Sequence, residues 1–305
     1  MTCYDNLVIY RKQLGDVLLL QPALATLASR GTVALATNPA FSDLVTLMPG
    51  PVYMAPQWLP KARQIYCLET RASAMAYAAQ GLGARRTLIL TRDKAPWWRS
   101  LIFGEMRVAP GNNTYRARLF HGALGGQPED FSPPSLTPPP LNWQIETVPA
   151  IYGVIHPTSA WQRKTWAPER WIEALRGIDT SLRWVVSSGT TPWEVKLAGA
   201  VAAGLGEQAI NLAGKTSLRQ YIALLSGACV TLCVDGSSSH ISAAFGKPTL
   251  TLFGPTNPTH WHFETPKTPR LWAADFAGER KPPVDAIPVI AVRNEVHRLL
   301  EMAND

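Results

Sequence analysis

The 305-residue sequence lacks the features that mark several protein classes. It has four cysteines and no apolar run of about 18 residues, so neither a disulfide framework nor a membrane-spanning helix is predicted. Cys229 and Cys233 lie four residues apart in an apolar segment, where packing on one face of a strand explains them better than metal binding. The N-terminal residues 1–6 lack the basic and apolar parts of a secretory signal, so we expect a cytoplasmic protein.

Several nucleotide-binding and metal-binding motifs are also absent. There is no Walker lysine motif and no Gly-x-Gly-x-x-Gly, and the glycines of residues 122–126 follow no predicted strand, which disfavours kinases and dehydrogenases. No Asp-x-Asp triplet and no histidine pair at metal spacing is present, so we expect neither a metal ion nor another cofactor. A Ser-His-Asp hydrolase is not supported either, because there is no Gly-x-Ser-x-Gly elbow.

Charge is unevenly distributed along the chain, whose formal net charge is +7. Between residues 85 and 118, eight basic residues accompany only two acidic ones. Such a segment suits an anionic partner, which can be a phosphorylated or carboxylated acceptor, an anionic membrane surface or nucleic acid; a solvated surface without a partner is the alternative. No nucleic-acid-binding module is recognisable, so we do not expect that partner.

Tryptophan is abundant, with eleven residues. Trp97, Trp98 and Trp161 lie close to arginines in the sequence, as on a surface that handles sugars, phosphates or lipid head groups. Packing in a core is the alternative for each of them.

The chain length and the alternation of predicted elements indicate two α/β domains. Strands are expected near residues 7–10, 32–36, 64–68, 87–90, 150–155 and 183–187, in the apolar segment that holds Cys229 and Cys233 and leads to Val234, and again from Thr249. Helices are expected near residues 17–28, 168–176, 194–205 and 288–302. The proline-rich segment 128–140 is the predicted linker. We therefore predict domains at 1–143 and 144–286, followed by a C-terminal helix within 287–305 that can cross back onto the first domain.

Hydroxyl-bearing and basic residues follow two of the predicted strands in the second domain. Thr158, Ser159 and Lys164 follow one strand, and the turn Asp235-Gly-Ser-Ser-Ser-His240 follows another. Backbone N–H groups, hydroxyls and an ammonium group in such turns can converge on a phosphate. The alternatives are a solvated lysine, a helix-capping aspartate and a hydrogen-bonded core histidine.

Asp16 follows Gly15 at a predicted strand-to-helix turn in the first domain. Ligands of open parallel sheets bind at the carboxyl ends of the strands, where a carboxylate can accept a proton from an attacking hydroxyl. The alternative is a helix N-cap without chemistry.

The sequence resembles glycosyltransferase family 9, the ADP-heptose:lipopolysaccharide heptosyltransferases. The resemblance covers residues 14–24 and nearly all of residues 151–258, and residues 30–145 match only loosely. Its strongest part runs from residues 212–218 through Asp235 to residues 253–258. It implies a GT-B fold: two Rossmann-like doubly wound domains that face each other across a cleft. The first is expected to bind the acceptor and the second the nucleotide sugar.

The same resemblance implies roles for individual residues. Asp16 occupies the position of the general base, Lys164 that of a lysine on the donor phosphates, and Glu194 that of a carboxylate near the nucleoside. The predicted catalytic residues are Asp16 and Lys164. The predicted donor-binding residues are Thr158, Ser159, Lys164, Ser188, Glu194, Asp235, Gly236, Ser237, Ser238 and His240. The predicted acceptor-binding residues are Arg11, Gly15, Lys61, Arg63, Arg92 and Arg118.

The implied reaction is an inverting, metal-independent transfer of a heptose or similar sugar. The donor is a nucleotide-diphosphate sugar, with ADP-heptose expected, and the acceptor is a lipopolysaccharide-core or related glycan at the inner membrane. Where the family has Asp-Thr-Gly-x-x-His, this chain has Gly236 and Ser237, so backbone amides and serines must bind the phosphate. A nucleotide-sugar epimerase or hydrolase of the same fold, and a non-catalytic binder, are the alternatives.

Overall fold

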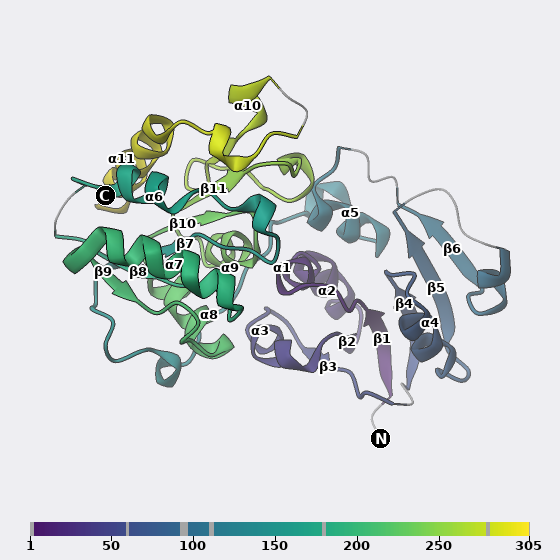
Figure 1. The fold of residues 1–305 in the computed structure, drawn as a ribbon. Coiled ribbons are helices and arrows are strands. Elements are labelled where there is room, and N and C mark those ends of the chain that lie inside the picture. The colour runs from purple at the N-terminus through teal and green to yellow at the C-terminus, as the bar shows by residue number, and fades with distance from the viewer. Residues whose placement is uncertain are drawn as a thin grey trace. The chain divides into compact units, whose positions relative to one another are not determined.

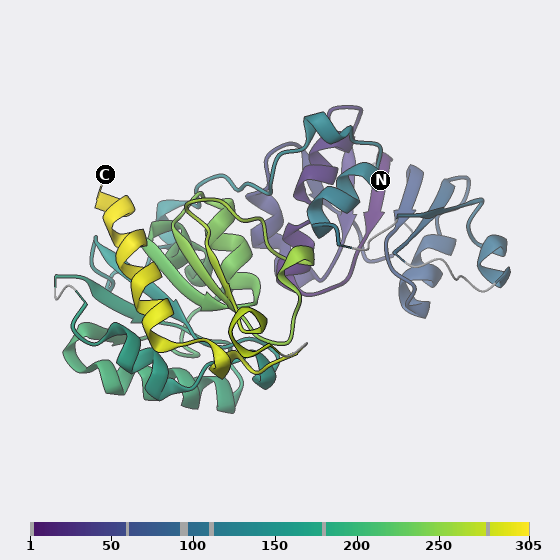
Figure 2. The same ribbon diagram turned by 90° about the horizontal axis from the view of Figure 1, so that it is seen from above.

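The computed structural model describes residues 3–58, 61–91, 97–109, 113–178, 181–278 and 281–304. The chain forms two compact units, Met1–Thr137 and Pro138–Asp305, and the division falls within the predicted proline-rich linker. Each unit is a parallel sheet with helices around it (Figure 1; Figure 2).

The first unit contains a six-stranded sheet in the order β3-β2-β1-β4-β5-β6, in which all neighbours are parallel. Its strands are β1 (Tyr4–Ile9), β2 (Val33–Ala36), β3 (Val52–Met54), β4 (Ala62–Cys67), β5 (Arg85–Leu90) and β6 (Glu105–Val108). Its helices are α1 (Leu14–Leu18), α2 (Gln21–Ala28), α3 (Ser42–Thr46), α4 (Ala72–Ala79) and α5 (Arg116–Ala123), with 3₁₀ turns η1 (Pro39–Phe41), η2 (Trp97–Leu101) and η3 (Pro128–Asp130). The strand order reverses between β1 and β4, and that switch point is where open α/β sheets bind ligands.

The second unit repeats this plan with the order β12-β11-β10-β7-β8-β9, again parallel throughout. Its strands are β7 (Tyr152–His156), β8 (Arg183–Val186), β9 (Ala209–Asn211), β10 (Val230–Val234), β11 (Thr249–Phe253) and β12 (Arg270–Trp272). Its helices are α6 (Pro168–Leu175), α7 (Pro192–Leu205), α8 (Leu218–Gly227), α9 (Ser237–Ala244), α10 (Ala274–Ala277) and α11 (Val289–Asn304), with 3₁₀ turns η4 (Leu141–Trp143), η5 (Gln162–Lys164), η6 (Gly206–Gln208), η7 (Pro258–His260) and η8 (Val284–Ala286). Here the switch point lies between β7 and β10. Both orders are those of Rossmann folds, so the predicted fold class is confirmed.

Burial explains why the strands of the second unit form a sheet covered on both faces. Every residue of β7, β10 and β11 is buried, as expected of parallel strands between two helical layers. Trp166, Trp171 and Trp184 fill the core, so for these three tryptophans packing is the correct interpretation.

The C-terminal helix packs on the second unit as its apolar stripe predicts. Val292, Val296 and Leu299 are fully buried, and α11 contacts α6, β10 and β11. The predicted crossing onto the first domain stays a prediction.

One predicted helix, residues 17–28, is divided in the structure into α1 and α2. Pro22 has no N–H to bond to Leu18, four residues earlier, and its ring would clash with that carbonyl, so α1 ends at Leu18. Proline is instead tolerated in the first turn of α2. The break makes α1 a short helix that directly follows the β1 loop.

Candidate active-site residues

The turn after β10 lies against the loop after β7 in the second unit. Gly236 is the N-cap of α9, and a Cβ atom placed on it would lie 3.5 Å from the Cβ of Ser159. Both loops leave the carboxyl ends of neighbouring strands at the switch point. The structure therefore brings together the two segments that the sequence singled out.

Lys164 and Asp235 form an ion pair between these two loops. The Nζ of Lys164 donates to Oδ2 of Asp235 at 2.6 Å, and the side chains are 17% and 5% exposed. The ammonium group also lies 5.0 Å from the centroid of the Trp161 ring. Lys164 is thus held in place rather than free in solvent, and partial burial strengthens its charge interactions.

Hydroxyl-bearing residues follow the same two strands. Thr158 is fully buried, and within the described part of the chain its Oγ1 has no hydrogen-bond partner. Buried hydroxyls are normally paired, so this unpaired oxygen is unusual. Ser238 is also fully buried, and the Oγ of Ser239 donates to the Gly236 carbonyl at 2.8 Å.

Two histidines near the turn are held in their neutral form. Burial lowers the pKa of His156 to about 4, and its Nδ1 lies 2.9 Å from the Oγ of Ser187. Burial also lowers the pKa of His240 to about 4, although the Asp235 carboxylate acts in the opposite direction. A neutral His240 can donate one N–H but brings no positive charge to a phosphate.

Glu194 and Ser188 lie together after β8. Glu194 is 7% exposed and takes part in a capping box, in which its Oε2 accepts from the Thr191 backbone N–H at 3.4 Å. The same oxygen also accepts from the Thr191 hydroxyl at 2.5 Å. The Oγ of Ser188 donates to the Gly189 carbonyl at 2.7 Å, and a Cβ on Gly189 would overlap the Glu194 carboxylate. Glycine at 189 therefore makes room for this carboxylate.

In the first unit, Asp16 is the third residue of α1, and Gln13 is the N-cap. Asp16 is therefore not the N-cap itself, but it caps the same helix, since its carboxylate accepts from the Gln13 N–H at 3.3 Å in a capping box. Gly15 is buried beside it. Asp16 is thus placed at the carboxyl end of β1, as the sequence predicts.

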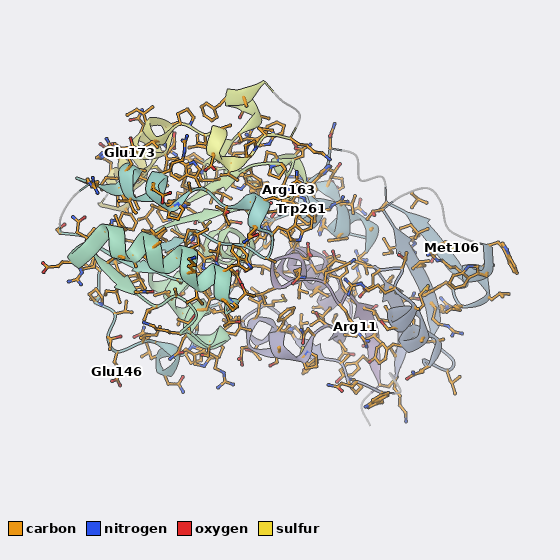
Figure 3. All side chains as sticks on the ribbon, viewed as in Figure 1. Arg11, Met106, Glu146, Arg163, Glu173 and Trp261 are labelled. Carbon is orange, nitrogen blue, oxygen red and sulfur yellow. The ribbon has the colours of Figure 1, made fainter. Side chains whose placement is uncertain are left out.

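A buried carboxylate, Glu69, organises the chain around Arg11, which is labelled in Figure 3. The Arg11 N–H donates to Oε1 of Glu69 at 2.5 Å, and Arg71 donates to the Arg11 carbonyl at 3.1 Å. The Arg11 guanidinium lies 4.7 Å from the centroid of the Tyr77 ring. These contacts fix the loop between β1 and α1.

The same charges act on Tyr10. Burial is the main cause that raises its pKa, and the carboxylates of Asp16 and Glu69 raise it further, while Arg116 and Arg71 lower it. Asp16 therefore shares an electrostatic environment with two arginines and a second carboxylate.

The predicted acceptor residues are not all brought together. Lys61 and Arg63 lie at the amino end of β4, where Arg63 pairs with Asp5 at 3.2 Å. Because the strands are parallel, this is the edge opposite Arg11, Gly15 and Asp16. Arg92 lies outside the described residues.

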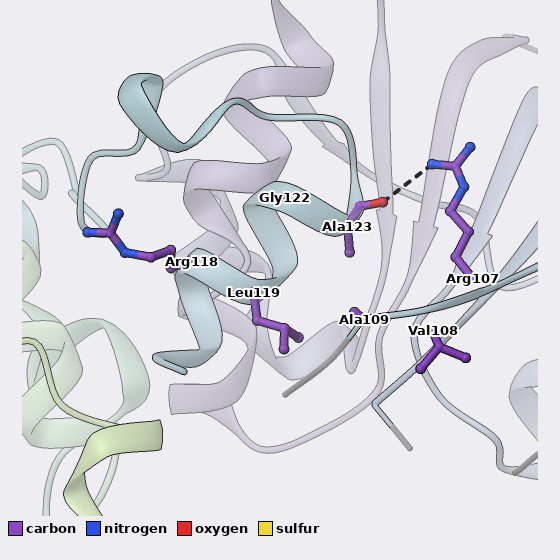
Figure 4. Close-up of a pocket in the computed structure, with 7 residues that line it drawn as sticks. All are labelled: Arg107, Val108, Ala109, Arg118, Leu119, Gly122 and Ala123. Atoms are coloured by element: carbon purple, nitrogen blue, oxygen red, sulfur yellow. Dashed lines mark hydrogen bonds between the residues drawn. The ribbon is translucent and has the colours of Figure 1, made fainter. Parts of the chain in front are cut away.

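Arg118 lies at a pocket of about 540 Å³ between β6 and α5 (Figure 4). The pocket is lined by Arg107, Val108, Ala109, Arg118, Leu119, Gly122 and Ala123. The Arg118 guanidinium stacks over Phe131 at 4.3 Å, and Arg107 pairs with Glu105 at 2.6 Å.

Sequence reasoning did not select Glu69, Arg71, His156 or Tyr221. Glu69 and Arg71 follow β4 at its carboxyl end, so the rule that selected Asp16 also applies to them. Tyr221 contacts the His156 ring at 5.2 Å from within α8, and nothing in the sequence indicates that contact.

Across the described ranges, no group of three or more His, Cys, Asp and Glu side chains is placed to hold a metal ion. No helix in those ranges is long and apolar enough to cross a bilayer.

Comparison with known proteins agrees with this geometry. Residues 138–279 match the sequence model described as glycosyltransferase family 9 (heptosyltransferase). The matched segment makes up slightly less than half of the chain and lies within the second unit, so it supports the predicted family there. It contains every predicted donor-binding residue.

Curated proteins with similar sequences include lipopolysaccharide heptosyltransferase 1 of Pseudomonas aeruginosa and lipopolysaccharide heptosyltransferase 3 of Escherichia coli K12. The first is 36% identical over 114 residues (36% of this chain, 30% of the relative), and the second is 28% identical over 127 residues (41% and 37%). The matches thus span about a third of the length of these relatives.

The solved structure of E. coli ADP-heptose lipopolysaccharide heptosyltransferase II has the same fold. Its TM-score is 0.80 at 16% identity, over 99% of this chain and 100% of that one. Similarity at this level of identity shows the GT-B fold alone.

Proposed function

We propose that this protein is a glycosyltransferase that moves a heptose or similar sugar from a nucleotide-diphosphate donor to a lipopolysaccharide-core or related glycan. The expected donor is ADP-heptose. The observation that carries the proposal is the Lys164 ammonium group, which Asp235 holds at the switch point of the second unit, within the segment that matches the family 9 model.

The second unit supplies groups suited to a diphosphate. Lys164 offers a positive charge, and Thr158, Ser159 and the amides of the Gly236–Ser238 turn offer hydrogen-bond donors. Glu194 and Ser188 follow the neighbouring strand β8, where a nucleoside can bind. The names of the relatives support ADP as the nucleotide.

In the proposed reaction, an acceptor hydroxyl attacks the anomeric carbon of the donor sugar. The new C–O bond forms as the bond to the diphosphate breaks, so the anomeric configuration inverts and the nucleoside diphosphate leaves with the electron pair. Asp16 takes the hydroxyl proton, and Lys164 stabilises the charge that develops on the leaving diphosphate, without a metal ion.

The donor is tested by thermal unfolding of the full chain with ADP, UDP and GDP. A ligand at about 100 times its Kd adds roughly 2.7 kcal/mol to the free energy of unfolding. A shift selective for ADP supports the proposal, and a preference for UDP or GDP overturns the assignment of the donor. ADP binding without turnover would indicate a non-catalytic binder, and donor consumption without acceptor would indicate a hydrolase or epimerase.

Asp16→Asn is expected to lower the transfer rate at least 100-fold, because the amide cannot accept the proton. ADP affinity should stay within about twofold of wild type, since the donor groups lie in the second unit. The matched control is Asp43→Asn, which changes another carboxylate in the first turn of a short helix of the same unit. Transfer retained by Asp16→Asn would remove Asp16 from the role of base.

A further inference from the structure

The segment from Trp97 to Val108 exposes large apolar side chains at the outer edge of the first sheet. Trp97 and Leu101 are 77% and 76% exposed, and Trp98, Met106 and Val108 are 39–43% exposed. We call these five residues the β6 edge surface. Figures 1 and 2 show η2 next to β6, the last strand of the sheet, and Figure 3 labels Met106 on it.

Phe103 anchors the segment that carries the β6 edge surface to the core of the first unit. Phe103, between η2 and β6, is 1% exposed and packs in the first-unit core. All four residues of β6 are exposed. Apolar side chains gathered on such an edge mark an interaction site, because soluble proteins seldom leave them exposed together.

Arginines border the same surface. The Arg99 guanidinium lies 5.5 Å from the Trp98 ring, and Arg107 precedes Val108 on β6, where both line the pocket of Figure 4. Among the described residues between 85 and 118, Glu105 is the one acidic side chain, and Arg107 neutralises it at 2.6 Å. Arg99 therefore adds a positive charge beside the apolar side chains that no described acidic residue of this segment offsets.

We propose that the β6 edge surface docks onto a bilayer of anionic phospholipids. Trp97 and Leu101 enter the interface between head groups and acyl chains, where tryptophan is favoured, and the arginines lie near the lipid phosphates. A second copy of this chain is a poorer occupant, because a two-fold contact places two positive surfaces against each other. The inference does not depend on the proposed transfer reaction.

The test is sedimentation of the full chain with vesicles of phosphatidylcholine alone or mixed with phosphatidylglycerol. Wild type should bind the mixed vesicles, bind those of pure phosphatidylcholine far less, and be released by salt. Trp97→Ser/Leu101→Ser should weaken binding by on the order of tenfold or more. The matched control is Trp58→Ser/Leu141→Ser, which removes a tryptophan and a leucine that are 72% and 79% exposed elsewhere.

Thermal unfolding and the ADP-induced shift of each variant show whether the fold is kept. Equal vesicle binding by wild type and Trp97→Ser/Leu101→Ser would overturn the proposal. The proposal would also be wrong if the control Trp58→Ser/Leu141→Ser lost as much vesicle binding as Trp97→Ser/Leu101→Ser. A wild-type dimer in size-exclusion chromatography that the Trp97→Ser/Leu101→Ser change dissociates would assign the surface to a second copy instead.

Discussion

The ammonium group of Lys164 lies between the carboxylate of Asp235 and the indole of Trp161. Lys164→Ala should weaken ADP binding at least tenfold, about 1.4 kcal/mol, because the diphosphate loses its positively charged partner. Isothermal titration calorimetry measures this loss. Arg163→Ala is the control, since it removes an exposed positive charge from the same 3₁₀ turn and should leave the affinity nearly unchanged. Equal losses in the two variants would mean that only the net charge of the turn matters.

His156 gives the second unit a pH dependence below neutrality. Burial lowers its pKa to about 4, whereas an unfolded histidine titrates near pH 6.5. Between these values the unfolded chain binds a proton that the folded chain does not, so the free energy of unfolding falls as the pH decreases, by roughly 1.4 kcal/mol per pH unit. Above about pH 6.5 this contribution to stability is complete.

Urea unfolding at pH 7.5 and 5.0 tests this dependence. Between pH 7.5 and pH 5.0, the free energy of unfolding of His156→Gln should fall by about 2 kcal/mol less than that of wild type. The reason is that glutamine binds no proton in the unfolded chain. His297→Gln, which changes an exposed histidine on α11, should leave the difference as it is. If the free energy of unfolding of His156→Gln differed between the two pH values as much as that of wild type, His156 would not be the source of the pH dependence.

The place of single residues within each unit was predictable where a residue follows a strand. Asp16 in the first unit, and Thr158, Lys164 and Asp235 in the second, each lie at the carboxyl end of their own sheet, as that rule predicts. The pairing of Lys164 with Asp235 joins positions 71 apart in the sequence, and no periodic pattern encodes such a contact. Lys61 and Arg63 were predicted to bind the acceptor from their charge, but they lie at the amino end of β4, opposite the carboxyl ends where Asp16 lies.

At the scale of elements, the start of α7 sets the position of Glu194. Gly189→Ala should lower the free energy of unfolding by roughly 1–3 kcal/mol, because its Cβ would displace the Glu194 carboxylate from the capping box with Thr191. ADP affinity should fall as well if Glu194 contacts the nucleoside. Chemical denaturation and calorimetry measure the two effects.

Gly104→Ala is the control for that variant, since a Cβ on Gly104 meets nothing within 4 Å. Its stability and ADP affinity should stay close to wild type. A Gly189→Ala protein as stable as Gly104→Ala would show that the carboxylate moves aside at little cost.

Element types were predictable from sequence to a greater extent than element ends. The helix over residues 168–176 appears as α6 with almost the same bounds because Pro168 fixes its start. The break between α1 and α2 was missed because the apolar run through Leu18–Leu20 continues across it and hides the effect of Pro22. Three-residue strands such as β3, β9 and β12 carry too few residues for a periodic signal.

At the scale of the whole molecule, the basic excess of the first half should govern acceptor binding. The KM for an anionic glycan acceptor is expected to rise several-fold between about 0.05 and 0.5 M salt, because exposed charges are screened. The Kd for ADP should rise less, since Lys164 is partly buried. Steady-state kinetics measures the acceptor KM and calorimetry measures the ADP Kd over the same salt series. An acceptor KM that does not change with salt would contradict the prediction that basic residues of the first half bind the acceptor.

The two-unit plan itself was accessible to sequence reasoning. Length, alternating strands and helices, and the proline-rich segment near residue 138 each indicate two α/β units, and each sheet has the predicted parallel character. The family 9 match covers only the second unit, in agreement with the looser resemblance over residues 30–145.

The ion pair between Lys164 and Asp235 also bears on which nucleotides are accepted. A ligand that engages the lysine must compete with a carboxylate 2.6 Å away and must approach its negative charge. A single phosphate recovers little of that cost, whereas two linked phosphates can meet the ammonium group and the α9 turn at once. If the proposed donor site is correct, the ion pair is expected to favour nucleoside diphosphates over monophosphates.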